Sequence, residues 1–235
     1  MKCPSRRAGL AVSFSGGTPP ESGAQGHGNH GPQGDYAVVF SSTKQGWWIS
    51  CFSFSEVHPL AQQFVSDMEG PFRPAIDTNR AWAGKWQSRD NFSRVADGLS
   101  NQIFVGEKHI PLGRLGKCGK GVDSTSSAYV EQDDCSYLVS GEWAVSAGRA
   151  IVSNYVAGDA PISGRIEYPL SAPKDFSDDD SKAAIYHYGF GSYHPGISHF
   201  LLGDGSVRSV STTTSVTNIL QPLSLVNDGV SVALP

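Results

Sequence analysis

Glycine and proline restrict the possible folds of this chain more than any other feature of its sequence. The 235 residues include 27 Gly and 14 Pro, and both residues interrupt helices and strands and favour turns. Hydrophobic residues make up 39% of the chain and charged residues 17%, which is sufficient for a core. The sequence therefore predicts short strands and many turns, in a single α+β, mostly antiparallel β domain over residues 1–235.

Charge and hydropathy argue against two classes of partner. The net charge is -4 and the isoelectric point is about 5.9, so the chain lacks the basic footprint of a nucleic-acid-binding protein. No run of about 18 apolar residues is present, and no apolar stretch follows the basic start of the chain. We therefore expect no nucleic-acid partner, no membrane insertion by this chain and no export signal in it.

Four segments have the pattern of strands, and one of them, residues 47–54, continues the sheet after the first. Residues 36–40 are a short run of apolar, β-favouring residues, and residues 101–110 predict a third strand after a turn at residues 96–98. Residues 200–202 and 207–210 flank Asp204-Gly205. Because Asp-Gly supplies the two positive φ angles of a tight type I′ turn, this segment predicts a β-hairpin.

Apolar residues at helical spacing predict two helices. The first covers residues 55–68, and the second includes Val216, Ile219, Leu220 and Leu223. We expect Pro222 to limit the second helix to its first turns. Residues 8–34 are rich in Gly and Pro, which predicts a long loop or a partly disordered segment.

The four cysteines do not form a metal-binding pattern. They occupy positions 3, 51, 118 and 135, and no pair has the Cys-x-x-Cys spacing of a zinc site. Cys118 and Cys135 are candidates for a disulfide that would close a Gly-rich loop in an exported protein. Four unrelated thiols in a cytosolic domain are the alternative.

Clusters of acidic, histidine and aromatic residues can each be interpreted either as a binding site or as a solvated or packed segment without a ligand. Three acidic residues could bind calcium, but they lack EF-hand spacing, so a solvated acidic loop is favoured; these are Asp123, Asp133 and Asp134. His27 and His30 lie in the Gly-rich segment and favour a solvated loop over a metal site. Trp82 and Trp86 could form a glycan-binding platform, although packing is favoured. Calcium is therefore the one cofactor left open, and no other is predicted.

Four short motifs are spread along the whole chain. Cys3-Pro4-Ser5 near the start is followed later by Asp35-Tyr36-Ala37. Next come Asp97-Gly98, Asn101 and the run Gly106-Glu107-Lys108. His194 is followed by nine residues and then Asp204-Gly205, and Asn227-Asp228-Gly229 lies near the end. In this order the motifs resemble a prepilin-type, pseudopilin-like bacterial family of unknown function that is abundant in planctomycetes.

The resemblance implies a type IV pilin-like globular head with long loops, normally carried on an N-terminal membrane helix. In that family the Cys-Pro-Ser motif lies well after the helix, whereas here it begins at residue 3, so we expect the helix to be missing from this chain. The full-length form would be extracytoplasmic or at the cell surface. Its implied partners are other pilin-like subunits of a type II secretion or type IV pilus-like system.

The motif residues could also carry chemistry. His194 could be a metal ligand or a base oriented by Asp204. A structural role does not require a defined geometry between these side chains, so we favour it for the whole motif set. The set comprises His194, Asp204, Gly205, Asp97, Gly98, Asn101 and Glu107. The chain has no Gly-x-Ser-x-Gly, His-Glu-x-x-His or phosphate-binding loop motif. We therefore predict a non-catalytic structural subunit, not an enzyme, with an extracellular glycan- or solute-binding module as the alternative.

Overall fold

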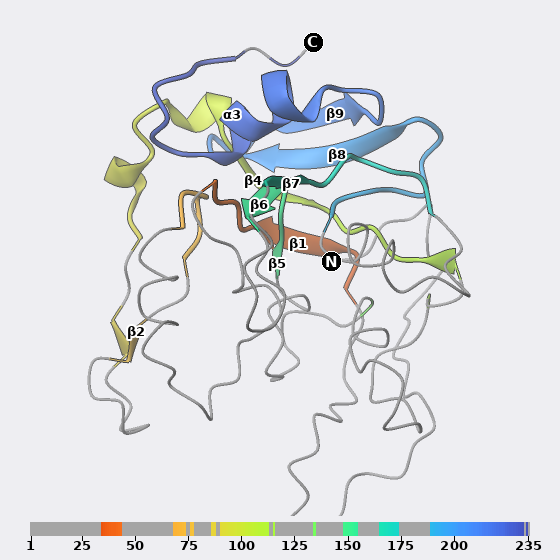
Figure 1. Ribbon diagram of the computed structural model, residues 1–235, viewed down its shortest axis with the longest axis horizontal. Helices are drawn as coiled ribbons and strands as arrows, with labels where there is room; N and C mark the ends of the chain where they lie inside the picture. The colour runs from red at the N-terminus through yellow and green to blue at the C-terminus, as the bar shows by residue number, and fades with distance from the viewer. Residues whose placement is uncertain are drawn as a thin grey trace, which may run out of the picture.

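A computed structural model describes part of the chain, and that part forms one central sheet with a short C-terminal helix (Figure 1). The described residues are 34–43, 68–73, 76–77, 86–87, 90–112, 115, 134, 148–154, 165–173, 189–232 and 234. The expected α+β, mostly antiparallel β fold class is confirmed. None of the helices in these ranges is both long and apolar enough to cross a membrane.

The central sheet has five strands in the order β5-β1-β4-β8-β9. All of its neighbouring strands are antiparallel except β1 and β5, which are parallel. The strands are β1 (Tyr36–Val39), β4 (Ile103–Glu107), β5 (Gly148–Arg149), β8 (Ile197–Leu202) and β9 (Val207–Ser211). Two small antiparallel pairs accompany it, β2 (Ile76–Asp77) with β3 (Trp86–Gln87) and β6 (Val152–Asn154) with β7 (Arg165–Glu167).

Within the described residues, the strands predicted from the sequence are present with small changes of boundary. The segment 36–40 forms β1, and the segment 101–110 forms β4 after two short 3₁₀ turns, η2 (Phe92–Arg94) and η3 (Leu99–Asn101). Of the helix predicted over residues 55–68, only Met68 is described, and it is buried. The strand predicted over residues 47–54 lies outside the described residues, and so does the long loop predicted over residues 8–34 except for Gly34.

The β8–β9 hairpin is confirmed, but its turn is not of type I′. Gly205 N donates to Leu202 O at 3.0 Å, so Gly203 and Asp204 are the central residues of the turn. Of the glycines in this loop only Gly205 has positive φ, at 88°, and Leu202 N donates to Ser206 O at 2.8 Å. This is the three-residue hairpin loop with a glycine bulge, in which one positive φ is enough.

The C-terminal helix continues through Pro222 instead of stopping in its first turns. A π-helical turn, η7 (Val216–Leu220), leads directly into α3 (Gln221–Ser224), and Ser215 caps the start by accepting from Asn218 N. Because Pro222 is near the N-terminus of α3, where a backbone N–H needs no helical partner, it is tolerated there. The different outcome follows from the π turn, which restarts the helix one residue before Pro222.

The core lies between one face of the sheet and this helix. Burial alternates along β8, with Ser198, Phe200 and Leu202 inside. The core cluster combines residues of β1, β4, β8 and β9 with Val216, Leu220 and Leu223 of the helical segment. In Figure 1 the helical segment lies beside β8 and β9. The opposite face of the sheet is only partly covered and carries the site described next.

Candidate functional site

A row of side chains crosses the partly covered face of the sheet at the end of β4. Tyr36 of β1 is paired with Glu107, and His199 of β8 is paired with Ser209 of β9. Glu107 and His199 lie one step beyond the pair Gly106 and Phe200, so they are cross-strand neighbours as well. Cross-strand neighbours share a face of the sheet. The register of four strands thus brings a carboxylate and an imidazole together.

The carboxylate of Glu107 is completely buried and its two oxygens have different surroundings. Glu107 has a relative exposure of 0%. Oε2 accepts a hydrogen bond from the backbone N–H of His199 at 2.8 Å. Oε1 lies 3.4 Å from Nε2 of His194 and has no hydrogen-bond partner in the described part of the chain. A distance of 3.4 Å is longer than the usual range of about 2.7–3.2 Å for N–H···O hydrogen bonds.

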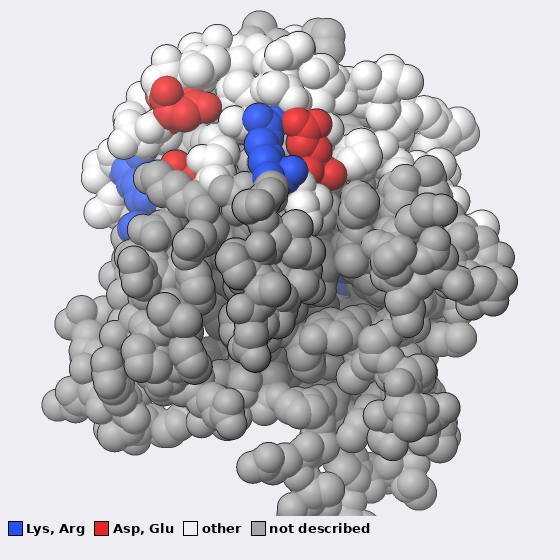
Figure 2. Space-filling model, viewed as in Figure 1, with Lys and Arg blue, Asp and Glu red and all other residues white. Residues whose placement is uncertain are grey.

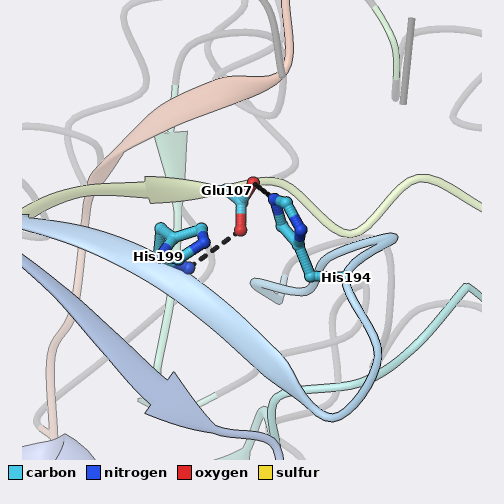
Figure 3. A group of neighbouring side chains, drawn as sticks. All are labelled: Glu107, His194 and His199. Atoms are coloured by element: carbon cyan, nitrogen blue, oxygen red, sulfur yellow. Dashed lines mark hydrogen bonds and ion pairs between the residues drawn. The ribbon is translucent and has the colours of Figure 1, made fainter. Parts of the chain in front are cut away.

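His194 reaches Glu107 from the loop that precedes β8 (Figure 3). Its backbone N–H donates to Ser192 Oγ at 3.1 Å, and Gly196, with a φ of 70°, reverses the chain before β8 begins. The His194 side chain is 26% exposed. The site is therefore closed at Glu107 and reachable from solvent at His194.

His199 completes a cluster of three potential metal ligands. Its ring lies 4.7 Å from that of His194, centroid to centroid, at an interplanar angle of 81°. Its Nδ1 is 3.0 Å from Ser209 Oγ, a hydrogen-bonding distance. One ligand atom from each of Glu107, His194 and His199 lies within 4.8 Å of the other two. Figure 3 shows Glu107 between the two imidazoles.

A second set of motif residues joins the start of β4 to the end of the chain. Asp97 Oδ2 accepts from Asp228 N at 3.0 Å. Asn101 Nδ2 donates to Asp97 O and to Ser231 Oγ, each at 3.0 Å. Burial raises the pKa of Asp228, and the nearby Asp97 carboxylate adds to the increase, against a lowering hydrogen bond from Val230 N–H. Gly98, with a φ of 94°, makes the turn between Asp97 and Asn101.

The carboxylate beside His194 is Glu107, not Asp204. Asp204 is exposed at the hairpin tip, beyond the far end of β8, where its Oδ1 accepts from Ser206 N at 2.8 Å. Its hydrogen bonds with Ser206 lower the pKa of Asp204. The two ends of the motif that runs from His194 to Asp204-Gly205 therefore have different roles. The His194 side chain faces β4, whereas Asp204-Gly205 forms part of the hairpin turn.

Most other candidate residues fall outside the described residues. These are Trp82, Asp123, Asp133, Cys118 and Cys135, together with His27 and His30. Trp86 lies in β3. Asp134 is buried, with a relative exposure of 0%, and its backbone O accepts from Gly34 N at 3.0 Å. The expectation that Asp134 belongs to a solvated loop is thus wrong, because this residue packs beside the chain leading into β1.

The sequence alone gave no reason to group His199 with His194 and Glu107. His199 has intermediate burial on β8, as is common for a residue on a half-covered sheet. Its role in the cluster follows from the register of β4 on β8, which joins residues 92 positions apart. The only local signal was the presence of two histidines five residues apart.

The fold and the cluster define a mostly antiparallel α+β protein with a His-His-Glu group on its sheet. Over residues 1–217 the chain matches the family described as "Protein of unknown function (DUF1559)", with the short name SBP_bac_10. The chain belongs to this family. Comparisons with curated proteins and with solved structures gave no match.

Proposed function

We propose that this chain is the non-catalytic head of a pilin-like, extracytoplasmic surface subunit of a type II secretion or type IV pilus-like system. The sequence resemblance to prepilin-type proteins motivates the proposal. The observation that supports it most is that motif residues form hydrogen bonds between distant parts of one β domain.

Two contacts of motif residues link segments that are far apart in the sequence. Glu107 accepts from the backbone of His199, 92 residues away, and Asp97 accepts from Asp228, 131 residues away. Gly205 provides the positive φ of the β8–β9 hairpin. Hydrogen bonds of this kind hold strands and loops in register, as expected for motifs that maintain a head domain.

The partly covered face of the sheet also suits contact with another subunit. Next to the row containing Glu107, an apolar row crosses four strands through the pairs Val38–Val105, Val105–Leu201 and Leu201–Val207. Val207 is 64% exposed. The other three side chains of this row are half-buried, and partly exposed apolar side chains in a continuous row are typical of surfaces that bind a partner.

Charged residues on the described surface of the molecule are mixed in sign. Figure 2 shows positive and negative side chains next to each other on the described surface of one face. Arg165 and Glu167 form such a pair, 2.7 Å apart, and both contact Thr217. A mixed surface favours association with similar subunits over attraction to a polyanion.

Prepilin processing in the native host tests the proposal. The gene is read upstream of Met1 for an in-frame prepilin segment, and the natural product is followed in cells with and without the prepilin peptidase. We expect an unprocessed precursor without the peptidase, and loss of the protein from the sheared surface fraction. A surface protein with an ordinary signal peptide is the control and should not change.

Two results would contradict the proposal. One is a product whose size and location do not depend on the peptidase. The other is the absence of a prepilin segment upstream, combined with a rise in melting temperature in the presence of glycans, which would favour the extracellular binding module instead.

A further inference from the structure

The three potential ligands on the sheet are of the types that bind zinc. Two imidazoles and one glutamate form the protein ligand set of several zinc sites that leave a fourth position for water or another group. Here they are His194, His199 and Glu107. Calcium, by contrast, takes six to eight oxygen ligands, and this cluster has a single carboxylate.

One separation between ligand atoms matches a tetrahedral zinc site, and all three atoms lie within 4.8 Å of one another. In a tetrahedral site with zinc–ligand distances of about 2.0–2.1 Å, two ligand atoms lie roughly 3.3 Å apart. Nε2 of His194 and Oε1 of Glu107 are separated by 3.4 Å. This separation is long for a hydrogen bond but close to the edge of a zinc tetrahedron.

A fully buried carboxylate oxygen without a hydrogen-bond donor points independently to a cation. Burying a charged or polar atom is costly unless a partner compensates it. Oε2 of Glu107 has such a partner in the backbone N–H of His199, whereas Oε1 has none among the described residues. The bond to Oε2 also fixes the carboxylate, so that Oε1 faces His194.

The imidazole ring of His199 is oriented by a hydrogen bond at its Nδ1 atom. Its Nδ1 lies 3.0 Å from the hydroxyl of Ser209. Metal-ligating histidines usually make such a bond with the ring nitrogen that does not bind the metal, which fixes the tautomer and the ring orientation. This contact leaves Nε2 of His199 available as the ligand atom.

From these observations we propose that Glu107 Oε1, His194 Nε2 and His199 Nε2 bind a single divalent transition-metal ion, with zinc as the best fit. The ion would connect the end of β4 to β8 and to the loop before it. Exposure of the His194 side chain gives the ion access from solvent. The site does not depend on pilin-like assembly, so it can be tested on the purified chain.

The experiment is a zinc titration of the purified chain after treatment with EDTA and dialysis. Calorimetry against a competing chelator gives the affinity, elemental analysis gives the stoichiometry, and Co²⁺ replaces Zn²⁺ to report the coordination through its visible spectrum. We expect one ion per chain in this cluster, a tetrahedral Co²⁺ spectrum, a higher melting temperature with Zn²⁺ and no change with Ca²⁺.

Matched variants identify the ligands. His194→Asn and His199→Asn should each abolish binding of this ion, while a His27→Asn, His30→Asn double variant should retain it. Ser209→Ala should lower the affinity about 10–100-fold, as for other groups that orient a ligand. Ser211→Ala removes a hydroxyl from the same strand, one that contacts Thr213 instead, and should leave the affinity unchanged.

Zinc binding by the wild type that the His27→Asn, His30→Asn double variant retains supports the proposed site even if a ligand variant is unstable. The proposal is wrong if the wild-type chain binds no zinc, or if folded His194→Asn and His199→Asn chains, checked by circular dichroism, retain the same ion. In that case Glu107 and His194 form an ion pair only. Failure of the prepilin-processing test would leave this outcome unaffected.

Discussion

Gly106 sits where β4 passes closest to two aromatic rings of the core. A Cβ atom at this position would come within 2.7 Å of ring atoms of Phe200 and Phe190, which themselves pack edge to face at 5.4 Å. Because both rings are fully or almost fully buried, they have little space to move. The residue next to Gly106 is Glu107, so any strand shift here would also displace the His-His-Glu cluster.

We therefore predict that Gly106→Ala destabilises the protein by about 3 kcal/mol, near the upper end of the cost of overpacking a core. Urea unfolding measures the change. Gly205→Asn is the comparison: a Cβ at Gly205 meets nothing within 4 Å, and Asn tolerates positive φ better than most residues, so it should lose only the smaller cost of that backbone conformation, about 1 kcal/mol. Equal stability of the Gly106→Ala variant and the wild type would mean that β4 does not approach Phe200 this closely.

At the scale of the element, β9 shows how sharply the sheet separates its two faces. Val207 is 64% exposed, whereas Val210, three positions later on the same strand, is 1% exposed and belongs to the core cluster. A strand alternates its side chains between faces. The same substitution at these two positions therefore tests which face is inside.

Aspartate at the two positions should have opposite outcomes. We expect Val207→Asp to change the free energy of unfolding by no more than about 0.5 kcal/mol, as for most surface substitutions. Val210→Asp would bury an unpaired carboxylate at a cost of several kcal/mol and should largely unfold the chain. Circular dichroism and thermal melting compare the two proteins, and similar losses in both would rule out the assigned faces.

The β-strands also show which features could be predicted from the sequence and which could not. Asp204-Gly205 located the hairpin correctly because Asp-Gly is a strong turn signal, but Asp-Gly also fits a glycine-bulge loop, and the preceding Gly203 allows the longer turn. Glu107 and His194 were each recognised as motif residues. Their contact was not predicted, because it depends on the pairing of β4 with β8 and not on any local pattern.

For the whole molecule, the folded domain extends beyond the residues that match the family. The family match ends at residue 217, yet six buried residues follow it, and four of these are large and aliphatic, namely Leu220, Leu223, Leu225 and Val226. Hydrogen bonds also cross this boundary: the side-chain Nε2 of Gln102 donates to Pro222 O at 3.2 Å, and the backbone N of Ala96 donates to Val226 O at 2.9 Å. The C-terminal segment is thus part of the core and not an appendage.

A chain that ends at Thr217 should consequently fail to fold cooperatively. Burying one large aliphatic side chain contributes about 1.5–3 kcal/mol, so the loss of four such residues is comparable to the whole stability of a typical domain, about 5–15 kcal/mol. A chain that ends at Ser231 is the control, because it keeps all four residues and loses, among the described positions, only Val232 and the partly buried Leu234. Near-ultraviolet circular dichroism and urea unfolding distinguish the two chains. A cooperative transition in the shorter chain would show that residues 34–217 form the core without the helix, and that the helix only covers it.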